Sequence, residues 1–159
     1  YIMYTQVDNW LEEDMVKYLD NQFTYDYPHY YGQRSVKGAK EFYISEMNPH
    51  DPLNNFLFTK LKNTLGKELN LIRMYINIQH EGMVSDFHSD DGDLTCLYMA
   101  SETLPDSGAF EIYEEQTVPF VQNTLVCFDA MKLHKGHAPL NTNKPRIALA
   151  FKTSYEENR

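Results

Sequence analysis

A chain of 159 residues, of which 42% are hydrophobic, suits one globular domain with a substantial core rather than a disordered segment. Its formal net charge of −9 argues against a nucleic-acid partner, because a phosphate backbone is held chiefly by cationic surfaces. The aromatic content of 14% favours strands and pocket walls.

The cysteines and the hydrophobic runs indicate the environment of the chain. Cys96 and Cys127 each lie in an apolar, strand-like run, which predicts buried free thiols rather than a disulfide framework. We therefore expect the protein to lie in a reducing compartment. This is the cytoplasm, or the cytoplasm of the host if the chain is phage-encoded. Neither a run of 18 apolar residues nor a signal peptide is visible, so we expect no membrane partner.

The N-terminal part predicts two helices. The first spans residues 9–22, where Asn9 and Glu12 have the spacing of a capping box. In residues 23–38 apolar side chains recur with no regular period, which predicts irregular structure with short extended pieces. The second helix spans residues 52–65, with Asp51 as its cap, Pro52 in its first position, leucines every four residues, and Gly66 at its end.

Strands dominate the remainder of the chain. Residues 71–79 alternate between apolar and polar side chains, as one strand with two different faces would. Further strand-like runs follow at residues 86–90, 94–100, 109–113, 124–128 and 146–153. We predict a single α+β, mainly β domain over residues 1–159, with a helical support region at 1–70 and a β core at 71–155.

The tripeptide His88-Ser89-Asp90 is the first candidate functional motif. Residues i and i+2 of a strand point to the same side, so His88 and Asp90 can share one metal ion. Two histidines and one carboxylate on one face are typical of non-haem iron oxygenases. The alternative is a solvated acidic turn, since aspartates surround the motif.

A second histidine must come from elsewhere in the chain. His134 follows a strand-like run, whereas His137 lies beyond a glycine in a more turn-like context. His80, at the end of a strand, is a third candidate. Placement on a strand favours His134, and the other two stay open as ligands or as outer groups.

Arg146 is a candidate anion-binding residue. It shares one face of its strand with Ala148 and Ala150, and these small side chains leave room for a ligand whose carboxylate the guanidinium can grip. The alternative is an arginine that opens a strand and pairs with a surface acid.

Taken together, these segments resemble the 2-oxoglutarate- and iron(II)-dependent dioxygenases, in particular the prolyl-4-hydroxylase-like branch with its small bacterial and phage members. The resemblance spans about half of the chain, from Arg73 to Phe151. It is carried, in order, by Arg73-Met74-Tyr75-Ile76-Asn77, Phe87-His88-Ser89-Asp90, Thr95-Cys96-Leu97-Tyr98, Gly108-Ala109-Phe110-Glu111-Ile112, Asn123-Thr124-Leu125-Val126-Cys127-Phe128, His134-Lys135-Gly136-His137-Ala138-Pro139 and Arg146.

The resemblance implies a double-stranded β-helix, or jelly roll, with the N-terminal helices packed on one sheet. It implies iron(II) on His88, Asp90 and His134, and 2-oxoglutarate as cosubstrate with its far carboxylate held by Arg146 and Tyr75. Ascorbate is the implied candidate reductant. The sequence departs from its relatives at Met99, Ala100-Ser101 and Ser107-Gly108-Ala109.

The implied reaction is hydroxylation of a prolyl residue in a peptide or protein. Tyrosines between residues 25 and 31 are candidates for one wall of a groove for an extended peptide, although they can equally serve in packing. Asp86 or Asn77 are candidates for orienting the ligands. The alternatives are a dioxygenase for a free amino acid or another small molecule, and a jelly-roll module that binds metal without turnover.

Overall fold

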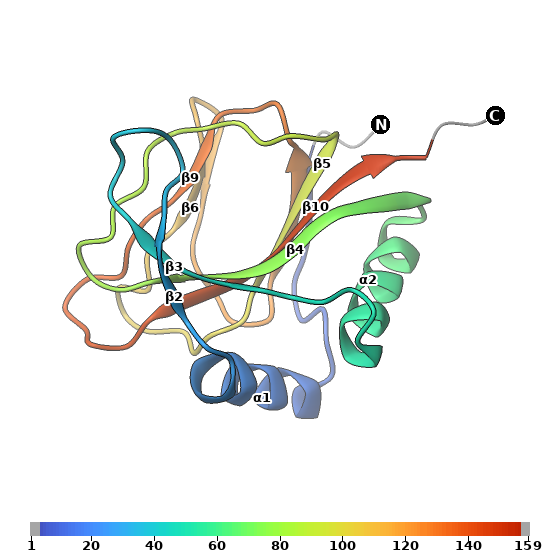
Figure 1. Cartoon of the computed structure of the whole chain (residues 1–159), viewed down its shortest axis with the longest axis horizontal. Helices are drawn as coiled ribbons and strands as arrows, with labels where there is room; N and C mark the ends of the chain where they lie inside the picture. Colours follow the sequence, from blue (N-terminus) through green and yellow to red (C-terminus); the bar gives the residue numbers. More distant parts are fainter. Residues whose placement is uncertain (1–3, 157–159) are drawn as a thin grey trace.

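The computed structural model describes residues 4–156, which form two helices, a π-helical turn and ten strands (Figure 1). The helical elements are α1 (Glu13–Asn21), η1 (Gln22–Asp26) and α2 (Pro52–Leu65). The strands are β1 (Tyr4–Val7), β2 (Tyr30–Gln33), β3 (Phe42–Glu46), β4 (Leu69–Gln79), β5 (Leu94–Met99), β6 (Phe110–Ile112), β7 (Gln116–Val118), β8 (Leu125–Asp129), β9 (His134–Gly136) and β10 (Arg146–Tyr155).

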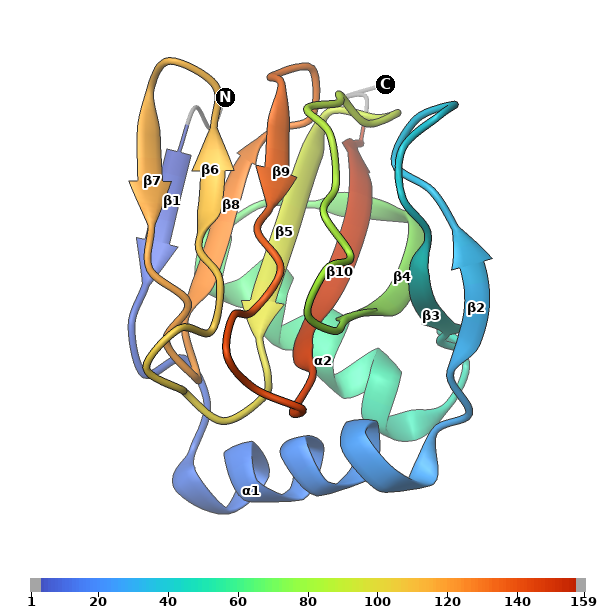
Figure 2. The same cartoon turned by 90° about the vertical axis from the view of Figure 1, so that its left-hand side faces the viewer.

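The strands form two antiparallel sheets. The major sheet has seven strands in the order β1-β8-β5-β10-β4-β3-β2, and the minor sheet has three in the order β7-β6-β9. Figure 2 shows the minor sheet lying in front of the β1, β8 and β5 side of the major sheet. One face of the major sheet is thus turned toward the minor sheet.

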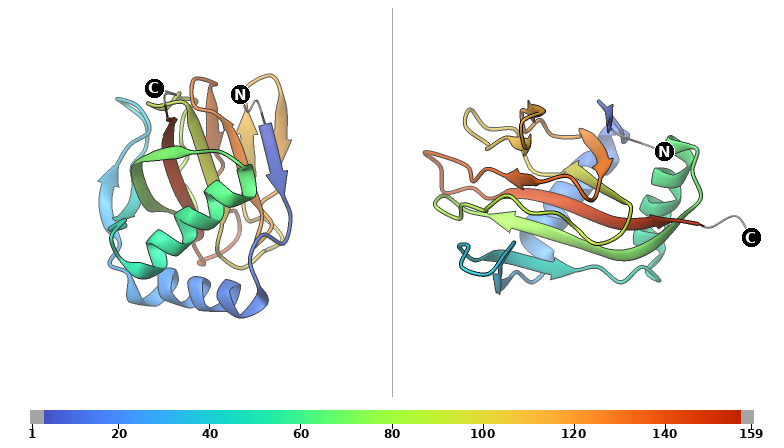
Figure 3. Two further views of the ribbon diagram at one scale, coloured as in Figure 1. Left: turned by 90° about the vertical axis from the view of Figure 1, so that its right-hand side faces the viewer. Right: turned by 90° about the horizontal axis from the view of Figure 1, so that it is seen from above.

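Alternation along the central strands separates the two sides of the major sheet. On β10, Ile147, Leu149 and Phe151 belong to the larger apolar core, which also contains buried residues of both helices. Ala148 belongs to a second, smaller core between the sheets. Helices α1 and α2 cover the face of the major sheet that lies away from the minor sheet (Figure 3). The helices therefore close one side, and the other side is left for a site between the sheets.

Helix α2 matches its predicted bounds, whereas α1 begins later than predicted. Gly66 ends α2 with a left-handed backbone, φ 62°, as the sequence indicates. Asn9 has φ 52°, outside the right-handed helical region, and α1 starts only after Glu12 without a side-chain capping hydrogen bond, so the predicted capping box of Asn9 and Glu12 is wrong. Glu12 itself is the N-cap residue of α1.

The N-terminal 70 residues are more than a helical support. They contribute β1 to one edge of the major sheet and β2 and β3 to the other, and these strands are short and lack a clear period in the sequence. Conversely, residues 86–90 form only an isolated bridge, His88 with His134, rather than a full strand. Strand β2 contains a bulge at Gly32, which has φ 119°, a backbone conformation suited to glycine.

Both cysteines lie on neighbouring strands of the major sheet. Cys96 and Cys127 are free, buried, and opposite each other on β5 and β8. Within residues 4–156, neither helix combines the length and the apolar character needed to cross a membrane.

The packing of α2 on the sheet predicts a contrast between two adjacent residues. Leu57 is fully buried and Phe56 is 51% exposed. We expect Leu57→Ala to lower the free energy of unfolding by about 2–5 kcal/mol, because it leaves a cavity against the sheet. Phe56→Ala should change it by only about 0.5 kcal/mol. Urea unfolding followed by circular dichroism measures both, and equal losses would contradict the described orientation of α2.

Candidate metal centre

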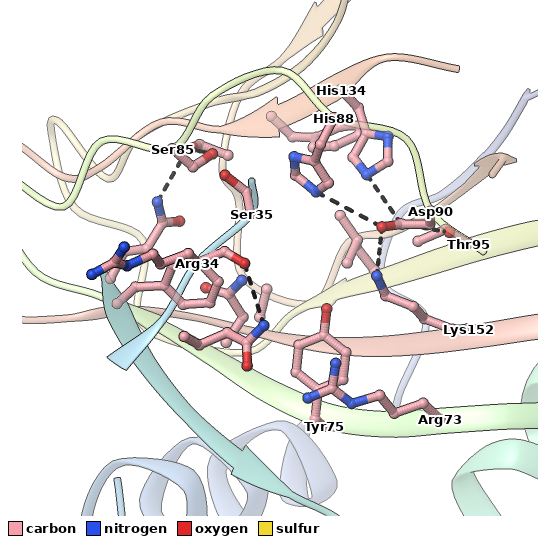
Figure 4. Close-up of a pocket in the computed structure, with 18 of the residues that line it drawn as sticks. Arg34, Ser35, Arg73, Tyr75, Ser85, His88, Asp90, Thr95, His134 and Lys152 are labelled. Carbon is pink, nitrogen blue, oxygen red and sulfur yellow. Dashed lines mark hydrogen bonds and ion pairs between the residues drawn. The ribbon is translucent and has the colours of Figure 1, made fainter. Parts of the chain in front are cut away.

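Three side chains that are distant in sequence meet between the two sheets. Within residues 4–156, His88, Asp90 and His134 form the one group of three potential ligands whose donor atoms all lie within 4.8 Å of one another. The Nε2 atom of His134 lies 3.1 Å from Oδ2 of Asp90, and Nε2 of His88 lies 3.8 Å from Oδ1. Figure 4 shows both imidazoles pointing toward the carboxylate.

Main-chain hydrogen bonds bring these residues together. The amide of His88 donates to the carbonyl of His134 at 3.1 Å, and the amide of His134 donates back to His88 at 2.9 Å. The amide of Asp90 donates to the carbonyl of Ala130 at 2.8 Å. The segment that carries His88 and Asp90 is therefore fixed against β9 and against the end of β8, although it is too short to be a strand.

The second nitrogen of each imidazole is also fixed. Nδ1 of His88 lies 2.9 Å from the main-chain carbonyl oxygen of Asp86, and Nδ1 of His134 lies 2.8 Å from that of Lys132. A carbonyl oxygen only accepts, so each Nδ1 carries a proton, and each Nε2 is the nitrogen that faces the centre and can bind a metal there once it carries no proton. Proteins commonly orient metal-binding histidines in this way. Asp86, a candidate for orienting the ligands, does so through its main chain.

The charges in the centre favour the ligand forms of these groups. Burial by itself raises the pKa of Asp90, but its hydrogen bonds and its attraction to His134 and Lys152 outweigh burial and hold that pKa well below the usual range. Burial lowers the pKa of His88, which favours the neutral imidazole. The centre therefore offers an ionised carboxylate and a neutral histidine at neutral pH.

The other two candidate histidines lie elsewhere. Nε2 of His137 lies 2.6 Å from Oε2 of Glu111, in a half-exposed pair outside the ligand cluster. The ring of His80 packs edge-on against Tyr43 with 5.7 Å between ring centroids. The structure thus brings His134, and neither His137 nor His80, to His88 and Asp90.

Arg146 is a buried cation, 4% exposed, whose hydrogen-bond partners are neutral groups. Its Nε donates to the carbonyl of Gly108 at 3.3 Å, and its Nη1 donates to Oε1 of Gln79 at 3.1 Å. The guanidinium carbon lies 4.7 Å from the centroid of the Phe120 ring. Among residues 4–156 no acidic side chain forms an ion pair with it, and burial lowers the pKa of Arg146 to about 10. An arginine in this setting is suited to an incoming anion.

One cavity of about 210 Å³ connects Arg146 with the ligand cluster. Its floor is the polar face of β4, where Tyr75, Asn77 and Gln79 follow one another at every second position. The side-chain oxygen of Asn77 is buried and, within the described part of the chain, has no hydrogen-bond partner. An unpartnered acceptor beside a buried cation indicates space for a polar ligand.

Tyr75 lines this cavity, but not at the Arg146 end. It lies opposite Ala150, whereas Gln79 lies opposite Arg146. In Figure 4 the hydroxyl of Tyr75 points toward the ligand cluster. Tyr75 and Arg146 therefore line the same cavity at different positions along β4 and β10, and their joint contact with a carboxylate stays a prediction.

Sequence reasoning missed two residues that contact Asp90. Oγ1 of Thr95 donates to Oδ2 of Asp90 at 2.8 Å, and Nζ of Lys152 forms an ion pair with Oδ1. The alternation of β10 gives one signal for Lys152, since it lies on the same face as Arg146. Only the folded structure shows that this face reaches the metal centre at its other end.

Comparison with known proteins supports the fold. No family model and no curated protein matches the sequence. Solved structures do match: a prolyl hydroxylase from Trichoplax adhaerens in complex with a hypoxia inducible factor peptide fragment is 12% identical, with a TM-score of 0.72 over 96% of this chain and 83% of that one. The viral collagen prolyl hydroxylase of Paramecium Bursaria Chlorella virus-1 is 12% identical, with a TM-score of 0.73 over 96% of both chains.

A third similar structure has a different type of ligand. HygX from Streptomyces hygroscopicus, with nickel, 2-oxoglutarate and hygromycin B bound, is 11% identical, with a TM-score of 0.70 over 96% of this chain and 82% of that one. These likenesses confirm the predicted jelly roll with helices on one sheet. At such identities they establish the shared fold, and the chemistry must be argued from the side chains of this chain.

The burial of His88 predicts its titration. In the metal-free protein we expect the imidazole of His88 to titrate below about 6.5, the usual value, because burial disfavours the charged form. The imidazole of His88 therefore binds a proton more tightly in the unfolded chain than in the folded one. As the pH falls below about 6.5, the free energy of unfolding decreases on account of His88. A ¹H–¹⁵N NMR titration of the imidazole measures the midpoint. The same resonance in urea serves as the control, and a midpoint at or above that of the unfolded chain would contradict the description.

Proposed function

We propose that this protein is an iron(II)- and 2-oxoglutarate-dependent oxygenase that hydroxylates its substrate. The observation that carries the proposal is the pairing, within one cavity, of a two-histidine, one-carboxylate cluster with a buried arginine that has no acidic partner among residues 4–156. Neither feature alone identifies the reaction. Together they match the needs of a metal ion and of an anionic cosubstrate that binds beside it.

The ligand cluster fits a divalent metal of intermediate softness. Imidazole and carboxylate ligands on one side of the ion suit non-haem iron(II) and leave the opposite positions open. His88, Asp90 and His134 would hold the ion, with both Nε2 lone pairs and one carboxylate oxygen directed to it. When bound, iron(II) and 2-oxoglutarate together would supply the oxidising power for hydroxylation.

The position of Arg146 fits a small dicarboxylate. A Cβ atom on Gly136 would lie only 3.1 Å from Nη1 of Arg146, so the guanidinium lies directly against β9. Gly136 is two residues from His134 on that strand, a separation of about 7 Å. One short dicarboxylate can therefore have one carboxylate at Arg146 and its other end at the metal. Gln79 would hold the guanidinium in place for it.

The finer proposal is that the substrate is a prolyl residue in a peptide or protein. Its support is the likeness to prolyl hydroxylases, one of them in complex with a peptide fragment. Tyr30 and Tyr31, on β2, are about two-thirds exposed, and the cavity is lined by the residues that follow them, Gln33, Arg34 and Ser35. These tyrosines therefore lie next to the cavity and can contact a long substrate.

A small-molecule substrate is the second candidate. The observation that favours it is the likeness, at a similar TM-score, to the structure of HygX with hygromycin B bound. A metal-binding module without turnover is the remaining rival. It would require neither the buried charge of Arg146 nor the shared cavity.

The metal and cosubstrate assignments predict a visible absorption band. We expect anaerobic titration of the protein with iron(II) and 2-oxoglutarate to produce the weak metal-to-ligand charge-transfer band of a chelated cosubstrate. His134→Ala should abolish the band because it removes a ligand. His137→Ala is the matched control and should retain the band, since His137 pairs with Glu111 outside the centre. If wild-type protein shows no band, the proposed function is wrong.

The role of Arg146 is tested in the same titration. Arg146→Met keeps most of the side-chain length and removes the charge, so iron(II) binding should persist while the affinity for 2-oxoglutarate falls about 10- to 100-fold. Unchanged affinity for 2-oxoglutarate would assign the arginine to structure alone.

The substrate class is tested by turnover. We expect proline-rich peptides to stimulate succinate release by the iron-loaded protein more than free amino acids do. The hydroxylated residue is then identified by mass spectrometry of the peptide. Stimulation by small molecules and not by peptides would favour the second candidate.

A further inference from the structure

Both oxygens of the Asp90 carboxylate are held by side chains of the major sheet. Thr95 Oγ1 donates to Oδ2 at 2.8 Å, and the Lys152 ammonium group pairs with Oδ1. Thr95 and Lys152 are directly opposite each other on β5 and β10. One cross-strand pair of the major sheet therefore contacts both oxygens of the Asp90 carboxylate; Figure 4 shows these residues.

Lys152 is itself closely surrounded. Its side chain is 17% exposed, and that of Asp90 is 4% exposed. On β4, Arg73 lies opposite Lys152 and forms an ion pair with Glu46. The Lys152 ammonium nitrogen lies 5.7 Å from the centroid of the Tyr75 ring. These neighbours limit the conformations open to the lysine, so it can act as a fixed donor rather than as a mobile surface charge.

We propose that Lys152 is a positioning residue for the metal centre, which acts with Thr95 to fix the plane of the Asp90 carboxylate. The inference rests on the proposed function. The last torsion of an aspartate has a broad, roughly two-fold preference, so one donor leaves the carboxylate free to turn. Donors on both oxygens define its plane and keep it directed toward His88 and His134.

The charge of Lys152 has a second effect, of opposite sign. A cation near a divalent ion repels it, so removing Lys152 relieves this repulsion while it frees the carboxylate. We expect the loss of orientation to dominate, because partners that orient metal ligands typically contribute 10- to 100-fold in metal affinity. Thr95 is uncharged, so its removal reports on orientation alone.

The experiment uses cobalt(II) as the probe, without cosubstrate and without turnover. Binding to the metal-free protein is followed by visible absorption and by calorimetry for wild type, Lys152→Met and Thr95→Val. Lys144→Met is the matched control, since Lys144 forms an exposed ion pair with Glu102 away from the cavity. Circular dichroism and thermal unfolding of each metal-free variant report whether the fold is retained.

We expect Lys152→Met and Thr95→Val each to weaken cobalt(II) binding about tenfold or more, and Lys144→Met to leave it unchanged. The visible bands of bound cobalt(II) should also change shape in the first two variants, because the carboxylate is no longer held in one orientation. A residue that only supports the fold would lower thermal stability without altering these bands.

Two outcomes would overturn the inference. If Lys152→Met binds cobalt(II) as tightly as wild type or more tightly, with unchanged bands, Lys152 is only a counter-ion of the metal-free centre. If wild type takes up no cobalt(II), the inference and the proposed function both fail. Wild type that binds cobalt(II) but gives no charge-transfer band with iron(II) and 2-oxoglutarate would overturn the proposed function alone.

Discussion

The pair of main-chain hydrogen bonds between His88 and His134 is the constraint on which the site depends. These bonds attach the segment that carries His88 and Asp90 to the minor sheet. The sheet registers then place Thr95 and Lys152 of the major sheet under the carboxylate. A slip of one residue in this bridge would turn the imidazoles away from the carboxylate, because alternate residues point to opposite faces.

Two positively charged side chains that line the cavity, Arg146 and Lys152, lie apart on strand β10. Lys152, on the side of β10 that faces the cavity, is neutralised by Asp90, whereas Arg146 on the same side has only neutral partners among residues 4–156. An anion therefore gains more from binding beside Arg146 than beside Lys152. A dicarboxylate would therefore place one of its carboxylates beside Arg146 in preference to Lys152. The small side chain of Ala148, which lies between these two cations on the strand, leaves the cavity open there.

The features predicted correctly from sequence are those encoded by local patterns. Helix α2 has a proline at its start and a glycine at its end, and β4 and β10 alternate over many residues. The His88 and Asp90 spacing together with the family likeness indicated which residues meet. Strands β1 and β7 escaped prediction because they are only four and three residues long and depend on their neighbours for pairing. Likewise, the places of Lys152 and Tyr75 depend on register between strands, which a single sequence does not specify.

The bulge in β2 has a consequence for how other chains can meet this one. Strand β2 forms one edge of the major sheet, and an unpaired edge can recruit a further strand from another molecule. The irregularity between Tyr31 and Gln33 interrupts the regular spacing of donors and acceptors that such recruitment needs. The bulge therefore makes this edge of the sheet a poor template for edge-to-edge association with another chain.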